Sequence, residues 1–282
     1  METKYNNPQK NPLFNIMKNI TSTYYYMDKF ERRDNDKFIE NKTELTDIGK
    51  EMFNMFGLDI VDIKFFVDIC AAPGMYSKII YDGRGPEDRP PTGIGISLPP
   101  EKGGVKFEFN HDNYKQFYKD ILEKQYKLEL PKKLDFGIAS CVSYIDDKKN
   151  SHLLNMELII TSLNMIMNNL MIDGSLIINM SMKNIYTCYN ILNILLEHFK
   201  IINLWKSSNI WGTKNTFYVF CYDFKTNNYN NNMIKYINMI KDNNSEINTK
   251  FLGTEENFKR ITRLIEPIYM VRINCWLNKI MS

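Results

Sequence analysis

Hydrophobic and polar positions follow two different periods along this chain. Between residues 44 and 56 the apolar side chains recur every three or four positions, which predicts a helix that ends before Gly57. From residue 64 onward, short apolar runs alternate with longer stretches of helical period. The short runs predict strands at 64–69, 93–98, 105–109, 133–140, 175–180, 201–205 and 216–222. The longer stretches predict helices at 77–81, 112–125, 153–171 and 185–199.

This alternation predicts an α/β fold, in which a mostly parallel sheet of seven strands carries helices on both faces. The last two predicted strands have only a loop between them, which suits an antiparallel edge. The sequence therefore favours a Rossmann-like arrangement with additional helices before and after it.

Composition divides the chain into three parts. Residues 1–43 are expected to form an N-terminal helical arm, which is loose over the first 20 residues and helical at 22–42. Residues 44–225 hold the alternating pattern and are expected to form the α/β domain. Residues 226–282 comprise a polar, asparagine-rich connection and an amphipathic helical extension, in which Pro267 predicts a kink or a break. This extension is expected to pack on the domain or on a partner.

The overall composition is that of an ordinary globular protein, with 44% apolar residues, 24% charged residues and a formal net charge of +3. Contact with nucleic acid would therefore require a local basic patch. The five cysteines are widely spaced and include no CxxC pair, so neither a disulfide nor a zinc site is expected. A reducing, cytoplasmic location without a membrane segment is the corresponding prediction. Heavy use of asparagine, isoleucine and lysine indicates an A+T-rich genome, such as that of some viruses.

One stretch, FVDICAAPGMYS at residues 66–77, carries the clearest chemical signal. A strand candidate ends in a turn of small residues, 70–74, before a helix begins. In open α/β sheets, ligands bind outside the carboxyl ends of the strands, and small residues let them approach the backbone. The turn is not GxGxxG and no Lys-Ser/Thr pair follows it, so dinucleotide and P-loop sites are not predicted. The alternative is a tight corner that binds nothing.

The same stretch resembles the cofactor loop of the FtsJ-like S-adenosylmethionine-dependent RNA ribose 2′-O-methyltransferases, with Met75 in place of the second glycine and Tyr76 in place of the aromatic residue. The segment GIGISLPPEKGG at 93–104 is similar to the second-strand segment of viral and eukaryotic members, and the resemblance runs from about residue 49 to residue 223. It implies a class I methyltransferase fold, S-adenosylmethionine as cofactor, and a role in RNA modification such as mRNA capping. The implied cofactor-binding residues are Asp68, Cys70, Ala71, Ala72, Pro73, Gly74, Met75, Tyr76, Ser97 and Asp112.

Two aspartates in this set also have a structural interpretation. Asp68 would attract the cationic part of the cofactor or order the loop, and Asp112 would accept a hydrogen bond from the adenine amine. Alternatively, Asp68 caps the helix that begins near Gly74, and Asp112 caps the helix predicted after it. The sequence leaves both interpretations open.

The resemblance also implies a Lys-Asp-Lys-Glu tetrad around the ribose hydroxyl, and most of it is missing. The hydroxyl is a very weak acid, so a base must take its proton as the methyl group arrives. Lys50 is the candidate for the first lysine. Ser140, Asn179 and Asn215 stand where the aspartate, the central lysine and the glutamate are expected, or Cys141 replaces Ser140 if the register shifts by one. Because asparagine is no base near neutral pH, the usual chemistry is expected to be impaired or lost.

Three functions stay open on this evidence. The first is a pseudoenzyme that keeps the cofactor and serves as a partner subunit in RNA capping or modification. The second is an active RNA 2′-O-methyltransferase whose rearranged site uses Lys50, Lys183 or Lys214. The third is non-catalytic RNA binding, in which Trp205 or Trp211 stacks on a base. No metal is expected, because the three histidines are scattered.

Overall fold

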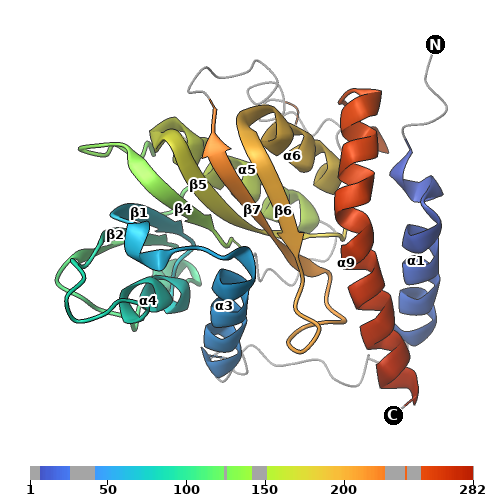
Figure 1. The fold of residues 1–282 in the computed structure, drawn as a ribbon, viewed down its shortest axis with the longest axis horizontal. Helices are drawn as coiled ribbons and strands as arrows, with labels where there is room; N and C mark the ends of the chain where they lie inside the picture. Colours follow the sequence, from blue (N-terminus) through green and yellow to red (C-terminus); the bar gives the residue numbers. More distant parts are fainter. Residues whose placement is uncertain are drawn as a thin grey trace.

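A seven-stranded sheet crosses the molecule in this computed structural model, with the strand order β3-β2-β1-β4-β5-β7-β6 (Figure 1). The structure describes residues 7–25, 42–123, 126–141, 151–225, 239 and 249–281. Strands β3, β2, β1, β4 and β5 are parallel, and β7 is antiparallel to both of its neighbours. The predicted mostly parallel sheet with an antiparallel edge is therefore confirmed. The strands are β1 (Phe65–Ile69), β2 (Thr92–Ser97), β3 (Tyr114–Tyr118), β4 (Leu134–Ala139), β5 (Leu170–Ser181), β6 (Phe199–Trp205) and β7 (Thr216–Phe224).

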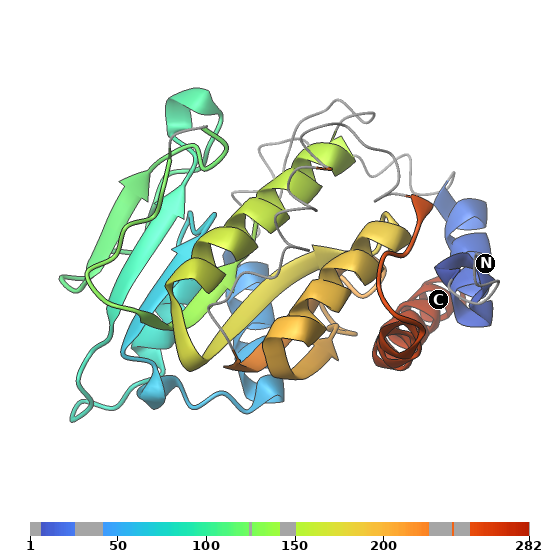
Figure 2. The same cartoon turned by 90° about the horizontal axis from the view of Figure 1, so that it is seen from above.

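Helices cover both faces of this sheet, as Figures 1 and 2 show. On one face, α3 (Lys42–Phe56) and α4 (Met75–Asp82) pack over strand residues such as Phe66 and Phe136. On the other face, α5 (Ser151–Asn169) and α6 (Ile185–His198) pack over strand residues such as Val67 and Ile178. Successive strand residues point to opposite faces, so each strand supplies both layers of core. The predicted Rossmann-like architecture is confirmed.

Residues 8–10 and 12–25 are helical, so the expectation of a loose arm is wrong for the described part of the first 20 residues. A short 3-10 helix η1 (Pro8–Lys10) leads into α1 (Pro12–Tyr25), which lies beside the long C-terminal helix α9 (Glu255–Met281) in both views. The Asn11 side-chain amide donates to the Glu266 carboxylate at 3.1 Å. Because the partner of α1 is so distant in sequence, no local pattern reveals the contact. Most of the helix predicted at 22–42 lies outside the described residues.

Helix α9 continues through Pro267, so the predicted break there is wrong. A proline inside a helix removes one backbone hydrogen bond and distorts the preceding turn. Ile265, Ile268 and Tyr269 on either side of Pro267 are buried against the rest of the protein. This packing stabilises the helix at the point where one of its backbone hydrogen bonds is missing.

The region between β2 and β4 is the main departure from the predicted elements. The strand predicted at 105–109 and the helix predicted at 112–125 are both wrong, because 114–118 forms edge strand β3 and pairs with β2. The apolar residues 114, 117, 118, 121 and 122 have helical spacing by chance. Pairing with β2 and cover from 107–109 override that local signal, since the Phe107 N–H donates to the Tyr118 hydroxyl and the Gln116 amide to the Phe109 carbonyl.

Among the helices described, none combines the length and apolar character that crossing a membrane requires.

Candidate functional site

The turn after β1 lies at the topological switch point of the sheet. Strands β1 and β4 are neighbours, while the chain passes from β1 outward to β2 and β3 before it returns to β4. The helices that follow these two strands, α4 and α5, pack on opposite faces of the sheet, and the carboxyl edge at such a point is where open α/β sheets form their ligand-binding crevice. Residues 70–74 lie at this edge, and the Ala71 N–H donates to the Ile96 carbonyl at 3.1 Å.

Gly74 is required by the protein's own packing. Its φ of +103° lies in the left-handed region, and a Cβ there would lie 2.8 Å from Phe109 Cβ. The Pro73 carbonyl accepts from the N–H groups of Glu108 and Phe109, at 3.0 and 3.2 Å. One side of the turn is thus covered by residues 108–109, whereas Cys70, Ala72 and Met75 remain partly exposed.

Asp68 is fully buried behind the turn and faces α4 rather than the crevice. The Ser77 hydroxyl donates to its Oδ2 at 2.8 Å and lies 2.9 Å from the Tyr114 hydroxyl oxygen. Burial raises the pKa of Asp68 to about 7, against a smaller opposing effect of its hydrogen bonds from Ser77. Asp68 therefore ties the first turn of α4 to β1 through the Ser77 hydroxyl.

A disulfide joins Cys70 to Cys141, and the expectation of no disulfide is wrong. The two cysteines are 71 residues apart in sequence, but Ile69 and Ala139 are paired residues of neighbouring strands, and Cys70 follows Ile69 directly while Cys141 lies two residues after Ala139. Their Cα atoms are 5.0 Å apart, within the usual range for a disulfide. Cysteine spacing could not reveal the pair, because it depends on the strand order.

Ser97 and Asp112 lie at opposite edges of the sheet. Ser97 ends β2, is buried, and its carbonyl accepts from the Lys119 N–H at 2.8 Å. Asp112 is exposed and precedes β3, so it lies at the amino edge and caps no helix. The sheet therefore separates Asp112 from the turn after β1.

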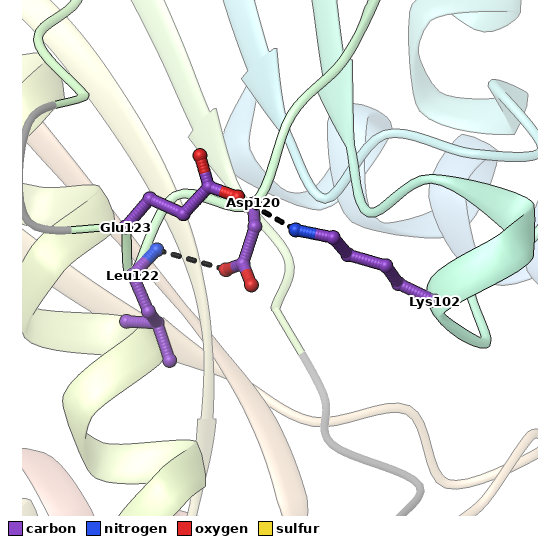
Figure 3. A network of polar contacts seen from close by, with 4 residues as sticks. All are labelled: Lys102, Asp120, Leu122 and Glu123. Atoms are coloured by element: carbon purple, nitrogen blue, oxygen red, sulfur yellow. Dashed lines mark hydrogen bonds and ion pairs between the residues drawn. The ribbon is translucent and has the colours of Figure 1, made fainter.

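Asp120 stands at the carboxyl edge just after β3, and sequence reasoning missed it because β3 was not predicted. Figure 3 shows its Oδ1 accepting from the Leu122 N–H at 3.0 Å. Beside it, Lys102 of the 3-10 helix η4 (Pro100–Lys102) pairs with Glu123 at 2.6 Å. Each of these two exposed groups favours the charged form of the other, raising the pKa of Lys102 and lowering that of Glu123. The ion pair connects the loops that follow β2 and β3.

Tyr218 pairs with Asn179 across the strands and contacts Tyr76. The sequence did not indicate Tyr218 as a site residue. Asn179 on β5 lies directly opposite Tyr218 on β7, and the Tyr218 and Tyr76 hydroxyl oxygens are 2.7 Å apart. Burial raises the pKa of Tyr218 to about 12. This phenol stays protonated near neutral pH and is no base there.

The other positions implied by the tetrad are spread along the same edge. The Ser140 N–H donates to the Ile69 carbonyl at 3.2 Å, and the Asn215 carbonyl accepts from the Met182 N–H at 3.0 Å. Lys50 lies exposed on α3. Lys183 and Lys214 are also exposed, one after β5 and the other before β7. The carboxylates next in sequence after Ser140, at positions 146 and 147, lie outside the described residues.

The loop 206–215 between β6 and β7 is held by a buried lysine. Lys206 donates to the carbonyls of Trp211, Lys214 and Thr216 at 3.0, 2.9 and 2.7 Å. Burial, with a smaller effect of the nearby Arg272 charge, lowers the pKa of Lys206 to about 7. Lys206 thus stabilises the loop by donating to these three backbone carbonyls.

Helices α3 and α9 hold the same loop from outside. The Ser207 hydroxyl donates to Glu51 at 2.7 Å, and the Trp211 indole donates to Glu44 at 2.9 Å. From α9, the Arg272 guanidinium donates to the Thr213 carbonyl at 3.0 Å. Trp211 is therefore part of the loop's support.

Of two hollows on the described surface, the larger borders the end of the turn after β1 through Met75 and Phe109. The larger, of about 710 Å³, lies on the outer face of α4 and is lined by residues that include Lys78, Tyr81 and His111. The smaller, of about 340 Å³, lies between α3, β6 and α9 and includes Trp205 in its wall. Within the described ranges, no three His, Cys, Asp or Glu side chains are grouped so as to hold a metal ion.

Comparison with known proteins gives one family. A search of curated protein sequences found no match. Among solved structures, a Plasmodium falciparum protein assigned as a ribosomal RNA methyltransferase is 20% identical, with 65% of this chain and 96% of that chain covered and a TM-score of 0.48. The N-methyltransferase NodS of Bradyrhizobium japonicum in complex with S-adenosyl-L-homocysteine is 14% identical, with 74% and 98% covered and a TM-score of 0.37.

Both TM-scores are below 0.5, so the assignment rests on the family model. That model, described as FtsJ-like methyltransferase, matches residues 49–224, which is more than half of the chain. The matched range holds all seven strands of the sheet together with the turn after β1. The chain belongs to the FtsJ-like methyltransferase family.

Proposed function

We propose that this chain binds S-adenosylmethionine at the carboxyl edge of β1, β2 and β3 and acts in RNA modification without the family's usual ribose chemistry. The residues at this edge fit the cofactor in kind. Cys70 and Ala72 are partly exposed and place little side-chain bulk beside the backbone where its amino-acid part would lie. Ser97 and Asp120 offer a hydroxyl and a carboxylate as acceptors for its ribose and adenine.

The main support for the loss of ribose methylation is the set of residues where β5 pairs with β7. Residues 179–181 of β5 pair with residues 216–218 of β7, and none of the six is a carboxylate or an amine. The bound cofactor would supply an electrophilic methyl group. Asn179 and the Tyr218 phenol can orient a hydroxyl beside it by hydrogen bonding, but neither takes its proton near neutral pH.

The same edge suits a binding role toward RNA. Lys50, Lys183 and Lys214 are exposed there, and exposed lysines attract phosphates. A chain that holds cofactor and RNA without transferring the methyl group would act as a partner subunit in a capping or modification complex.

The test measures binding and transfer separately. Calorimetry with S-adenosylmethionine and S-adenosylhomocysteine should show binding, while methyl transfer from labelled cofactor to capped and uncapped RNA should stay at background. The triple variant Ser140→Asp, Asn179→Lys, Asn215→Glu should raise transfer above background. Asn203→Lys, an exposed position on β6, is the matched control and should not.

Two results would overturn parts of this proposal. Absence of cofactor binding under reducing conditions removes the cofactor assignment. Robust transfer by the unaltered chain removes the loss of chemistry. If Lys183→Ala or Lys214→Ala then abolishes that transfer, a rearranged active site takes its place.

A further inference from the structure

The Cys70–Cys141 disulfide lies at the topological switch point, beyond the carboxyl ends of β1 and β4. Cys70 is the first residue of the turn after β1, and Cys141 follows Ser140 at the end of β4. Because β1 and β4 are the neighbouring strands at the switch point, the bridge lies where open α/β sheets form their ligand-binding crevice. Neither of the two hollows described above includes Cys70, Ala71 or Ala72 in its wall.

The two cysteines differ in their exposure to solvent. Cys70 is partly exposed, whereas Cys141 is only 3% exposed. A thiolate in solution therefore reaches the Cys70 sulfur first, and the buried Cys141 sulfur is the leaving group.

A hydrogen-bond partner for the reduced Cys141 thiol is already in place. The Ser162 hydroxyl lies 3.0 Å from Cys141 Sγ and donates its own proton to the Leu158 carbonyl at 2.7 Å. Its oxygen is then free to accept from the Cys141 S–H. Reduction therefore leaves the buried sulfur satisfied on the α5 side, away from the crevice.

From this placement we infer that Cys70 and Cys141 form a redox-modification site that closes the cofactor crevice as a disulfide and opens it as two thiols. The inference rests on the proposed function, because it concerns access of S-adenosylmethionine to the turn after β1. The other three cysteines take no part: Cys188 and Cys221 are buried on other elements, and Cys275 lies on α9.

The reaction is thiol–disulfide exchange with a small thiol such as glutathione as the reductant. Its thiolate attacks Cys70 Sγ, the bond between the two cysteine sulfurs breaks, and Cys141 leaves as a thiolate that takes a proton. A second thiolate attacks the glutathione sulfur of the mixed disulfide and releases Cys70. In total, two thiols are oxidised to one free disulfide, and the protein disulfide is reduced to two thiols.

The test compares cofactor binding in the two states of the full chain. Protein is oxidised with glutathione disulfide or reduced with a phosphine, and the thiols are counted by alkylation and mass spectrometry. The expected counts are three and five, since the chain has five cysteines and three are free. Calorimetry with S-adenosylhomocysteine should then show at least about tenfold tighter binding to the reduced protein.

Two variants separate the site from a general effect of oxidation. The double variant Cys70→Ser, Cys141→Ser, which leaves no thiol at the bridge for glutathione to modify, should bind with the same affinity under both conditions. Cys275→Ser, a partly exposed cysteine outside the bridge, should keep the full difference. Circular dichroism confirms that each variant is folded before the comparison.

Each remaining outcome overturns the inference. Equal affinity in both states, with the thiol count changing from five to three, overturns it and leaves the proposed cofactor binding intact. Tighter binding to the oxidised protein would show that the disulfide favours cofactor binding instead of blocking it. Five thiols after oxidation would show that the bridge does not form. Absence of binding in both states overturns the proposed cofactor binding as well.

Discussion

The turn after β1 and the loop between β6 and β7 lie at the same edge of the sheet but are stabilised in different ways. The turn is shaped by its own backbone, with Gly74 at positive φ and backbone groups of residues 71 and 73 paired with nearby main chain. The loop is held by side chains instead, from Lys206 within it and from α3 and α9 outside it. A backbone-shaped turn is recognisable in a sequence, because glycine and proline mark it. A loop held by side chains is not, because its supports come from distant elements.

The largest expected effect comes from removing the Lys206 ammonium group, which holds the loop between β6 and β7. Lys206→Met leaves three carbonyls without their donor, so the free energy of unfolding should fall by about 4 kcal/mol. Urea denaturation measures the change. Lys214→Met, an exposed lysine of the same loop, should change stability little. Equal losses in the two variants would show that Lys206 does not hold the loop.

A somewhat smaller effect is expected in the backbone-shaped turn. Gly74→Ala combines the strain of a positive φ with overlap against Phe109 Cβ and should cost about 3 kcal/mol by urea denaturation. Gly103→Ala separates the two contributions, because Gly103 has a φ of +88° and no atom within 4 Å of the added Cβ. Its cost should be about 1 kcal/mol. If Gly74→Ala costs no more than Gly103→Ala, contact with Phe109 does not shape the turn.

The smallest effect concerns the pH dependence of stability near the turn. Asp68 has a pKa raised from 3.8 to about 7 in the folded protein, so between these values the folded state holds a proton that the unfolded state releases. Its contribution to stability is present below pH 4 and is lost as pH rises toward 7. Asp68→Asn should remove about 2 kcal/mol of this decline between pH 5 and 7.

Urea denaturation of both proteins at pH 5, 6 and 7 measures that difference. Asp82→Asn, which removes an exposed carboxylate of α4, should keep the slope of the unaltered chain. An unchanged slope in Asp68→Asn would show that Asp68 is ionised throughout this range.

Much of the sheet could be predicted from the sequence, because its central strands are continuous apolar runs bounded by turn residues. Strands β1, β2 and β4 lie close to their predicted ranges, and the small-residue turn lies at the predicted strand end. Strand β3 was missed because, as an edge strand, it carries polar residues such as Lys115 and Gln116 among its aromatic ones.

The missed parts of the site follow from the same limits. Asp120 could be placed only after β3 was known, and the Cys70–Cys141 pair only after β1 and β4 were known to be neighbours. Tyr218 was hidden inside an ordinary apolar strand, and its contact with Tyr76 depends on how α4 packs. These contacts depend on which elements are neighbours in the folded protein, and the periodicity of the sequence does not show that.

The pairing of α1 with α9 has a consequence for the order of events during synthesis. Asn11 and Glu266 are 255 residues apart, and the whole sheet lies between them in the sequence. At ribosomal rates of 5–20 residues per second, the synthesis of α9 is complete roughly 10 to 50 s after that of α1. The sheet can assemble on the ribosome in that interval, while the apolar face of α1 around Phe14 and Met17 has no α9 to cover it. The contact between α1 and α9 therefore forms only after all seven strands of the sheet have been synthesised.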